Sequence, residues 1–312
     1  MSETDADPTA SEPTDAEPTD AEPTAAETVG SASDETASSA VRTADAVGNG
    51  TVDLAGDPIL EVDALEKRFG GIVAVDGASF AVDRGSITGL IGPNGAGKST
   101  VFNCITGVHR ADGGTVTFDG MDITRQSPNR IALKGLVRTF QITRELPQMT
   151  VLENMMLAPK DQLGESLWRS VTPGARRGVV RQEEQVRDRV WETLEFFEIE
   201  HLAEEYAANL SGGQRKLLEL ARALLTDPEM LMLDEPMAGV NPTLEEKLLE
   251  QIHGLRSQGY TFLIVEHDMD LIMEHCDRVI VMHQGSVLAD GAPEAVASDE
   301  AVIDAYLGGG GS

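Results

Sequence analysis

A glycine-rich loop directly after an apolar run constrains this chain most. Ile87–Ile91 is continuously apolar and ends at a glycine, which predicts a strand buried on both faces. The next eight residues fit the pattern G-x-x-x-x-G-K-[ST] of a phosphate-binding loop, which needs a strand before it and a helix after it. The sequence therefore predicts an α/β fold. The loop consists of Gly92, Pro93, Asn94, Gly95, Ala96, Gly97, Lys98 and Ser99.

The residue types in this loop suit the binding of a nucleotide. Glycines let backbone N–H groups converge on phosphate oxygens, and the start of the following helix adds its positive end. We expect Lys98 to reach the β- and γ-phosphates and Ser99 to bind Mg²⁺. Thr100 is expected to cap the same helical turn.

A second apolar strand, Met230–Leu233, ends in two acidic residues. Asp234 should emerge at the carboxyl edge of the sheet, where it would hold Mg²⁺ directly or through water. Glu235 follows at once and is expected to polarise the attacking water as a general base. An Asp-Glu pair after a strand is often an ordinary turn, but its place after a phosphate loop favours ATP hydrolysis.

Two further polar residues follow predicted strands. Gln141 supplies a neutral side chain able to contact both metal and water, and its value comes only from its position between the loop and a helical region. His267 follows the strand Phe262–Val265 and is expected to bind the γ-phosphate and stabilise the transferring group. The competing interpretation is a metal site, but its spacing matches no structural zinc pattern. That site would consist of Glu266, His267, His275 and Cys276.

A second glycine-rich helix start predicts a composite nucleotide site. Its backbone donors form another anion site in the same chain. One ATP has one γ-phosphate, and Lys98 already serves it. Two chains arranged head to tail would let each Ser211 face the nucleotide of the other, which predicts ATP-dependent dimerisation. This helix start consists of Ser211, Gly212, Gly213 and Gln214.

The chain divides into three parts. Residues 1–57 repeat Thr, Asp, Ala, Glu and Pro and contain almost no large apolar residue, so we expect a disordered acidic tail with a solvating role. Residues 58–307 should form one folded domain, with a helical insert at about 150–210 that Pro173-Gly174 interrupts. Residues 308–312, Gly-Gly-Gly-Gly-Ser from 308, should be a flexible end.

Periodicity predicts the elements of the folded part. Alternation predicts antiparallel strands at 60–65 and 74–80. The last predicted strands are 137–141 and 279–282, and helices are expected near 243–257 and 268–275. Val186, Val190, Leu194 and Phe197 form one helical stripe.

Composition excludes several classes of partner and compartment. The 53 acidic residues outnumber the 24 basic ones, giving a formal charge of −29, which repels nucleic acid and anionic lipid. An acidic, lysine-poor chain of this kind resembles proteins of halophilic archaea. Apolar runs are shorter than a membrane span, so we expect a soluble or membrane-peripheral protein. The two cysteines fit a reducing compartment.

These motifs in this order resemble the ATPase subunit of an ATP-binding-cassette (ABC) transporter, over residues 58–307. The resemblance implies a P-loop NTPase fold: a mixed sheet core, an antiparallel β subdomain and a helical subdomain. It also implies that Gln141 is the glutamine loop, Leu210–Gln214 the signature motif and His267 the switch histidine. Phe69 matches the aromatic position that stacks on adenine, where tyrosine is usual.

Further motifs are similar to those of branched-chain amino acid importers, in particular the longer of their two ATPases. They are Arg138–Gln141, Met149–Asn154, Ala238–Pro242 and Val302–Gly308. The resemblance implies two integral-membrane permeases, a second related or identical ATPase and, indirectly, an extracellular binding protein. The ATPase would lie at the cytoplasmic face of the cell membrane.

Other functions remain open at this point. Similar ATPases serve importers of urea, amides or aromatic acids, and a lipid exporter has a closely similar cassette. A soluble cassette acting on DNA or ribosomes is disfavoured by the single cassette, the lack of a coiled coil and the repulsive charge.

Overall fold

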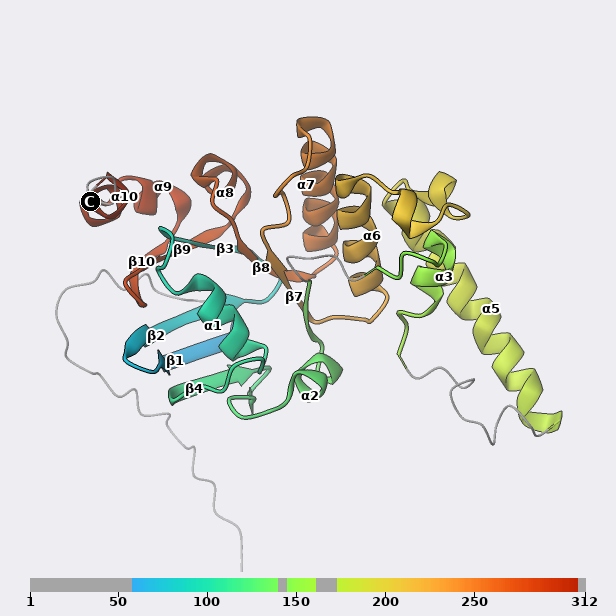
Figure 1. Cartoon of the computed structure of the whole chain (residues 1–312), viewed down its shortest axis with the longest axis horizontal. Coiled ribbons are helices and arrows are strands. Elements are labelled where there is room, and N and C mark those ends of the chain that lie inside the picture. Colours follow the sequence, from blue (N-terminus) through green and yellow to red (C-terminus); the bar gives the residue numbers. More distant parts are fainter. Residues whose placement is uncertain (1–57, 140–144, 161–172, 308–312) are drawn as a thin grey trace, which may run out of the picture. The chain divides into compact units, whose positions relative to one another are not determined.

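The computed structural model describes residues 58–139, 145–160 and 173–307, all within the compact unit Asn49–Ser312. Two sheets and the helices packed on them make up this unit (Figure 1). The predicted tail 1–57, the flexible end 308–312 and Gln141 lie outside the described residues.

The smaller sheet is antiparallel, with strand order β2-β1-β4-β5. The strands predicted at 60–65 and 74–80 are confirmed, and both are longer than predicted. Strand β4 was not predicted, although its buried Val116 and Phe118 alternate with less buried residues and Asp119-Gly120, both with positive φ, make the turn that follows. The strands are β1 (Pro58–Phe69), β2 (Ile72–Asp83), β4 (Gly113–Phe118) and β5 (Met121–Asp122).

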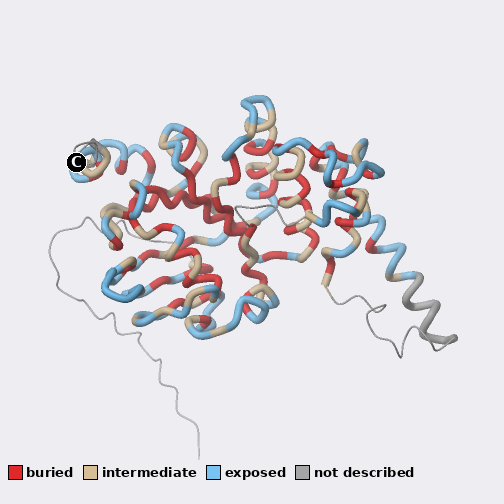
Figure 2. Tube along the Cα trace, in the orientation of Figure 1, coloured by how far each residue is buried: buried red, intermediate tan, exposed pale blue. Residues whose placement is uncertain are grey.

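The larger sheet is mixed, with strand order β10-β9-β3-β8-β7-β6, and only its edge strand β10 is antiparallel. Strands β3, β7 and β8 are buried along their whole length, and β9 is buried except at its two ends (Figure 2). The predicted mixed core with an antiparallel β subdomain is confirmed. The strands are β3 (Ile87–Ile91), β6 (Leu136–Arg138), β7 (Met230–Asp234), β8 (Thr261–Val265), β9 (Arg278–His283) and β10 (Ser286–Gly291).

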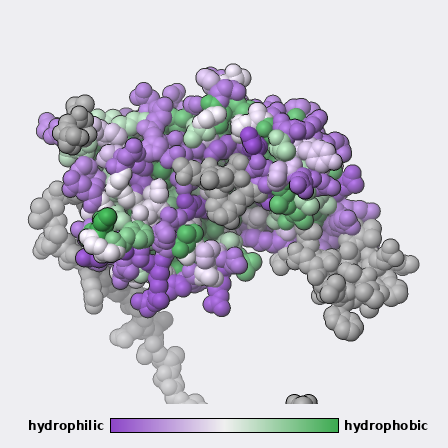
Figure 3. Space-filling model, viewed as in Figure 1, coloured by the Kyte–Doolittle hydropathy of each residue, from purple (hydrophilic) through white to green (hydrophobic). Residues whose placement is uncertain are grey.

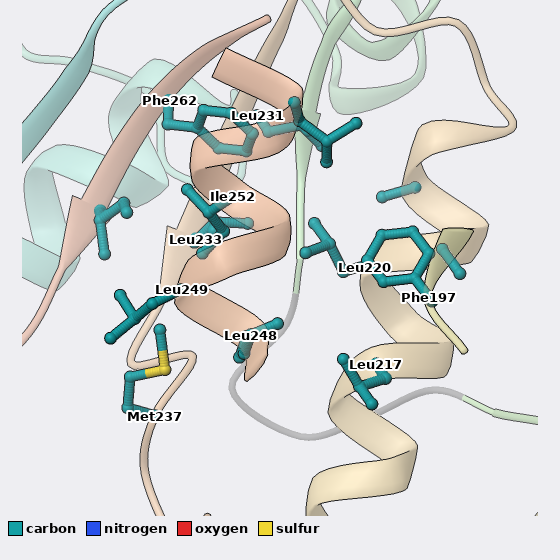
Figure 4. Packing of buried hydrophobic residues seen from close by; sticks show 14 of the residues in the cluster. Phe197, Leu217, Leu220, Leu231, Leu233, Met237, Leu248, Leu249, Ile252 and Phe262 are labelled. Atoms are coloured by element: carbon teal, nitrogen blue, oxygen red, sulfur yellow. The ribbon is translucent and has the colours of Figure 1, made fainter. Parts of the chain in front are cut away.

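Different elements cover the two faces of the larger sheet. Alternate strand residues separate the two clusters: Met232 and Leu263 join the cluster of the smaller sheet, whereas Leu233 and Ile264 join the other. Helix α1 (Lys98–Ile105) packs on the first face. The second face is covered by α6 (Gly212–Leu224), α7 (Pro242–Ser257) and α8 (Met269–His275). Figure 4 shows the apolar side chains of α6 and α7 packed beside those of β7 and β8.

The region predicted as helical is helical where it is described. Helix α5 (Pro173–Phe196) begins at the proline that was predicted to interrupt the region, since proline is favoured at a first helical position. The predicted stripe is buried from Val186 to Phe197 and packs in the same cluster as α6. The preceding helix is α3 (Val151–Met156), and two 3₁₀ turns, Glu200–Leu202 and Ala207–Asn209, lead to α6.

Short helices complete the unit. Helix α2 (Pro128–Leu133) precedes β6, and α9 (Pro293–Ala297) and α10 (Glu300–Leu307) follow β10. Of the helices described, none is both long enough and apolar enough to cross a bilayer.

Candidate functional site

Three strand ends bring the predicted residues to one edge of the larger sheet. Leu90 of β3 and Asp234 of β7 both pair with Val265 of β8, so the three strands end in register. The segments that follow them carry the phosphate loop, Glu235 and His267. Parallel strands thus place residues distant in sequence at one edge, where α/β proteins bind ligands.

The phosphate loop is tightly enclosed by backbone. Gly92 has φ +148°, and a Cβ there would lie 2.1 Å from the carbonyl oxygen of Met282. Gly97 has φ +103°, and a Cβ there would lie 2.5 Å from the carbonyl oxygen of Ala74. Both positions therefore need glycine, because a side chain would collide with backbone that cannot yield.

The start of α1 is free of side-chain capping. Its N-cap residue is Gly97, in the left-handed region, and no side chain makes a capping hydrogen bond. The expectation that Thr100 caps this turn is therefore wrong. The first turn of a helix leaves backbone N–H groups without intrahelical partners, so an uncapped start is suited to an anion.

Lys98 is buried within the loop. Its Nζ donates to the carbonyl oxygen of Gly92 at 2.6 Å and lies 3.3 Å from that of Pro93. Burial lowers the pKa of the Lys98 ammonium, while the nearby Glu235 and Asp234 carboxylates act in the opposite direction. The ammonium is thus held by weak neutral acceptors that a phosphate could replace.

Asp234 forms a buried ion pair at the end of β7. Asp234 is 4% exposed, and its Oδ2 lies 2.6 Å from Nη2 of Arg138. Nη1 of Arg138 donates to Oδ1 of Asn103 on α1 at 2.7 Å. The sequence analysis gave Arg138 no role. The Asp234 carboxylate and the exposed Ser99 hydroxyl at the start of α1 are the hard oxygen donors that Mg²⁺ prefers, so the chemistry of these two residues fits the ion.

Glu235 and His267 are hydrogen-bonded to each other. Oε1 of Glu235 lies 2.7 Å from Nε2 of His267. Glu235 has φ +49°, which is costly for a non-glycine residue. Its N–H donates to the carbonyl oxygen of Val265 at 2.9 Å, and its own carbonyl accepts from Nζ of Lys216 at 3.2 Å. Strand β8 and helix α6 thus hold this turn in place.

The residues of the competing metal site face different partners. Glu266 is buried, and its carboxylate accepts from the N–H groups of Met237 and His267 at 2.8 and 3.3 Å. Burial raises the pKa of this carboxyl, although these two hydrogen bonds oppose the shift. His275 pairs with His253 at 3.1 Å. Within residues 58–139, 145–160 and 173–307, no three His, Cys, Asp or Glu side chains form a metal-binding group.

Phe69 lies at the end of β1 and is 43% exposed. Its ring meets that of His109 edge-on at 5.2 Å, and Nζ of Lys67 lies 5.3 Å from its centroid. Ile72 and Val73 are also exposed at this hairpin, where Figure 3 shows apolar atoms gathered on the surface. An exposed aromatic face here can stack on a planar ring.

The second glycine-rich helix start is capped, unlike that of α1. Ser211 and Gln214 form a capping box, in which each side chain accepts from the backbone N–H of the other. A Cβ on Gly213 would lie 2.0 Å from Cδ2 of Leu244 on α7, so a larger residue here would force the Leu244 side chain to move. Because α6 and α1 cover opposite faces of the larger sheet, Ser211 belongs to a different face from the phosphate loop of its own chain.

A tyrosine from the last helix reaches the phosphate loop. The N–H of Gly92 donates to the hydroxyl of Tyr306 on α10. Burial raises the pKa of Tyr306 to about 12, while this hydrogen bond acts in the opposite direction. The sequence analysis noted the segment around Tyr306 but not this contact, since nothing local in the sequence reports it.

Replacing Tyr306 with phenylalanine is expected to loosen the start of the phosphate loop. The ring stays, but the Gly92 N–H loses an acceptor worth about 1 kcal/mol, so its amide should exchange about five- to tenfold faster. Hydrogen exchange of the peptide that contains Gly92 measures this. Tyr206→Phe, at an exposed tyrosine, is the control and should change nothing there. Equal exchange in both variants would contradict a role for the hydroxyl.

Comparisons with known proteins agree with this geometry. A family model described as ABC transporter matches residues 75–238, and one described as branched-chain amino acid ATP-binding cassette transporter matches residues 286–312. A probable branched-chain amino acid transport ATP-binding protein of Archaeoglobus fulgidus is 44% identical over 250 residues, covering 80% of this chain and 95% of the relative. A high-affinity branched-chain amino acid transport ATP-binding protein of Escherichia coli is 42% identical over 254 residues, covering 80% and 98%.

Solved structures give the same result. A nucleotide-free ATP-binding cassette from an ABC transporter superposes with a TM-score of 0.69 at 40% identity, covering 80% of this chain and 99% of that one. An ATP-binding cassette of an ABC transporter in its ADP conformation superposes with a TM-score of 0.69 at 39% identity, covering 81% and 99%.

Proposed function

Because this chain belongs to the ABC transporter family of ATPases, we propose that it drives the import of branched-chain amino acids from the cytoplasmic face of a cell membrane. It is an ATP-hydrolysing subunit of a multi-subunit transporter with membrane components. The observation that carries the proposed chemistry is the in-register end of β3, β7 and β8, which brings Lys98, Asp234 and the Glu235–His267 pair to one edge. The proposed substrate rests on the relatives, which are named as branched-chain amino acid transport ATP-binding proteins.

The phosphate loop holds ATP in this proposal. The N–H groups at the start of α1 and the Lys98 ammonium bind the phosphates, and Phe69 stacks on the adenine. Ser99 and Asp234 would hold Mg²⁺, together with Gln141 as the family resemblance implies. When bound, the ion neutralises charge that develops on the phosphate oxygens.

Glu235 accepts a proton from the attacking water, for which its carboxylate is held by Nε2 of His267. When ATP is bound, the N–H of His267 would donate to the γ-phosphate in place of Glu235 and stabilise the charge of the transition state. The strained turn at Glu235 fixes the direction of the carboxylate, since Val265 and Lys216 hold its backbone from two sides.

A second cassette completes the site. The helix start at Ser211, Gly212, Gly213 and Gln214 faces the γ-phosphate bound by the partner cassette, which is another copy of this chain or a related ATPase. Closure on ATP and opening after hydrolysis then supply the motion.

The proposed docking surface for the two permeases lies on the helical region around Leu146–Met156. A groove of about 270 Å³ between α3 and α5 is lined by apolar and charged side chains. Leu146 and Leu157, which flank α3 in the sequence, are exposed. The lining residues are Leu152, Met156, Glu183, Glu184 and Arg187.

The test is to recover partners of the Glu235→Gln variant from native membranes at high salt with ATP present. We expect two permeases and a related or identical ATPase, with an associated binding protein whose ligand is a branched-chain amino acid. A binding protein for urea, an amide or an aromatic acid would correct the substrate alone. Recovery of soluble proteins only would contradict the transport function.

A further inference from the structure

We propose that Arg138 is a resident cation of the metal site, which holds Asp234 while no Mg²⁺ is present and which Mg²⁺ must displace. The inference rests on the function proposed above for Asp234. It assigns Arg138 as a positioning residue that sets the affinity of the cassette for its metal.

Arg138 is held from three directions at the end of β6. Nη2 lies 2.6 Å from Oδ2 of Asp234, and Nη1 lies 2.7 Å from Oδ1 of Asn103. The guanidinium carbon lies 5.6 Å from the centroid of the Phe102 ring. The Arg138 and Asp234 side chains are only 14% and 5% exposed, so water screens this pair little. The planar fork of arginine links the end of β7 to helix α1 in this way.

Lys98, a second cation near Asp234, does not take this role. Nζ of Lys98 makes its hydrogen bonds with the carbonyl oxygens of Gly92 and Pro93, and its effect on Asp234 is through space. A buried carboxylate is unfavourable without a hydrogen-bonded partner, and Arg138 is that partner.

Arg138 and a metal ion would compete for the same carboxylate. Mg²⁺ binds carboxylate oxygens at about 2.0–2.1 Å in near-octahedral geometry or through its ordered waters. A guanidinium at 2.6 Å from Oδ2 occupies one of these oxygens and repels a second cation. By linkage, the Arg138–Asp234 ion pair lowers the affinity of the site for the metal, and the bound metal weakens that ion pair by the same factor.

Loss of the Arg138–Asp234 contact would act on the end of β6. Arg138 is the last residue of β6 and lies three positions before Gln141 in the sequence. Within the described residues, its buried Nε has no hydrogen-bond partner, so the guanidinium is incompletely satisfied where it lies. Release of Arg138 on metal binding therefore changes the end of the strand that leads into the glutamine loop.

The test compares Arg138→Gln with wild type by Mn²⁺ electron paramagnetic resonance, with a non-hydrolysable ATP analogue present. Glutamine keeps a donor but removes the charge, so we expect the half-saturating Mn²⁺ concentration to fall about tenfold. The metal-free variant should also melt at a lower temperature than wild type, and saturating Mn²⁺ with nucleotide should close that gap. An unchanged or higher half-saturating concentration would overturn the proposal.

Two control variants distinguish the role of Arg138 from the metal-binding role of Asp234. Arg278→Gln breaks another buried pair, Arg278–Asp290, and should lower stability without shifting Mn²⁺ binding. Asp234→Asn should abolish tight Mn²⁺ binding; if it does not, the function proposed for Asp234 fails, whatever Arg138 does. Should Arg138→Gln not fold, Asn103→Ala removes one anchor of the guanidinium, and we expect a smaller fall in the same direction. If the half-saturating Mn²⁺ concentration of Asn103→Ala does not fall, the proposal is overturned.

Discussion

Replacing Glu235 with glutamine is expected to reduce ATP turnover by about 10²–10⁴-fold, the usual contribution of a general base. The amide has the shape of the carboxylate and keeps a hydrogen-bonding atom for Nε2 of His267, but it cannot accept the proton of the attacking water. Nucleotide binding should remain, because the phosphate loop is untouched. The variant should therefore accumulate as an ATP-bound dimer, measured by phosphate release and by mass in solution.

An exposed carboxylate on α7 supplies the control for this experiment. Glu250→Gln removes one negative charge outside the strand-end segments that carry the site and should hydrolyse ATP at the wild-type rate. Removing the hydrogen-bond partner instead, with His267→Ala, should cost less than Glu235→Gln, because the carboxylate remains. Turnover of Glu235→Gln near the wild-type rate would disprove the role of this carboxylate.

Local patterns predicted the parts of the site that follow apolar strands. The runs Ile87–Ile91, Met230–Leu233 and Phe262–Val265 are nearly continuous in apolar residues, which is typical of strands buried on both faces of a parallel sheet. The polar residues after them then emerge at its edge. This is why the neighbourhood of Lys98 and Asp234 could be predicted without coordinates. The hairpin at Asp119-Gly120 also had a readable signal, which the sequence analysis did not use.

Contacts between distant residues had no such signal. Arg138 reaches Asp234 across 96 positions of sequence, and Tyr306 reaches Gly92 from the last helix. Each depends on which strands become neighbours and on side-chain direction, which periodicity does not encode. The Thr100 prediction failed for a related reason. A threonine near a helix start suggests a cap, but the N-cap residue is Gly97. The tight loop requires its left-handed backbone.

The two glycine-rich helix starts therefore differ in a way that matters for function. The start of α1 has no side-chain cap, whereas the start of α6 is closed by the Ser211–Gln214 capping box. The uncapped start of α1 leaves backbone N–H groups free for the phosphates of the nucleotide that the same chain binds. At the start of α6 the capping box satisfies the N–H groups of Ser211 and Gln214, so a γ-phosphate from the partner would meet the remaining donors and the positive end of the helix.

A charge placed on Ser211 should separate binding from closure. Ser211→Asp keeps a good N-cap residue, so α6 should stay intact, but its carboxylate would face the γ-phosphate of the partner. Two like charges about 6 Å apart at an effective dielectric of about 20 repel by about 3 kcal/mol, which is about 100-fold. We expect ATP binding to the monomer to be unchanged, and ATP-dependent dimerisation and hydrolysis to fall by about that factor. Ser211→Asn, an equally good cap without charge, is the matched control and should lose far less.

Mixing variants then identifies the partner cassette. Lys98→Ala should lose nucleotide affinity, because its phosphate loop has lost the ammonium. A dimer of a Ser211→Asp chain with a Lys98→Ala chain would contain one intact composite site, so recovered hydrolysis on mixing would indicate two copies of this chain. Recovery only with a related ATPase would indicate a heterodimer. If Ser211→Asp alone dimerises and hydrolyses ATP as well as Ser211→Asn, the composite site is wrong, since no γ-phosphate would then lie near this helix start.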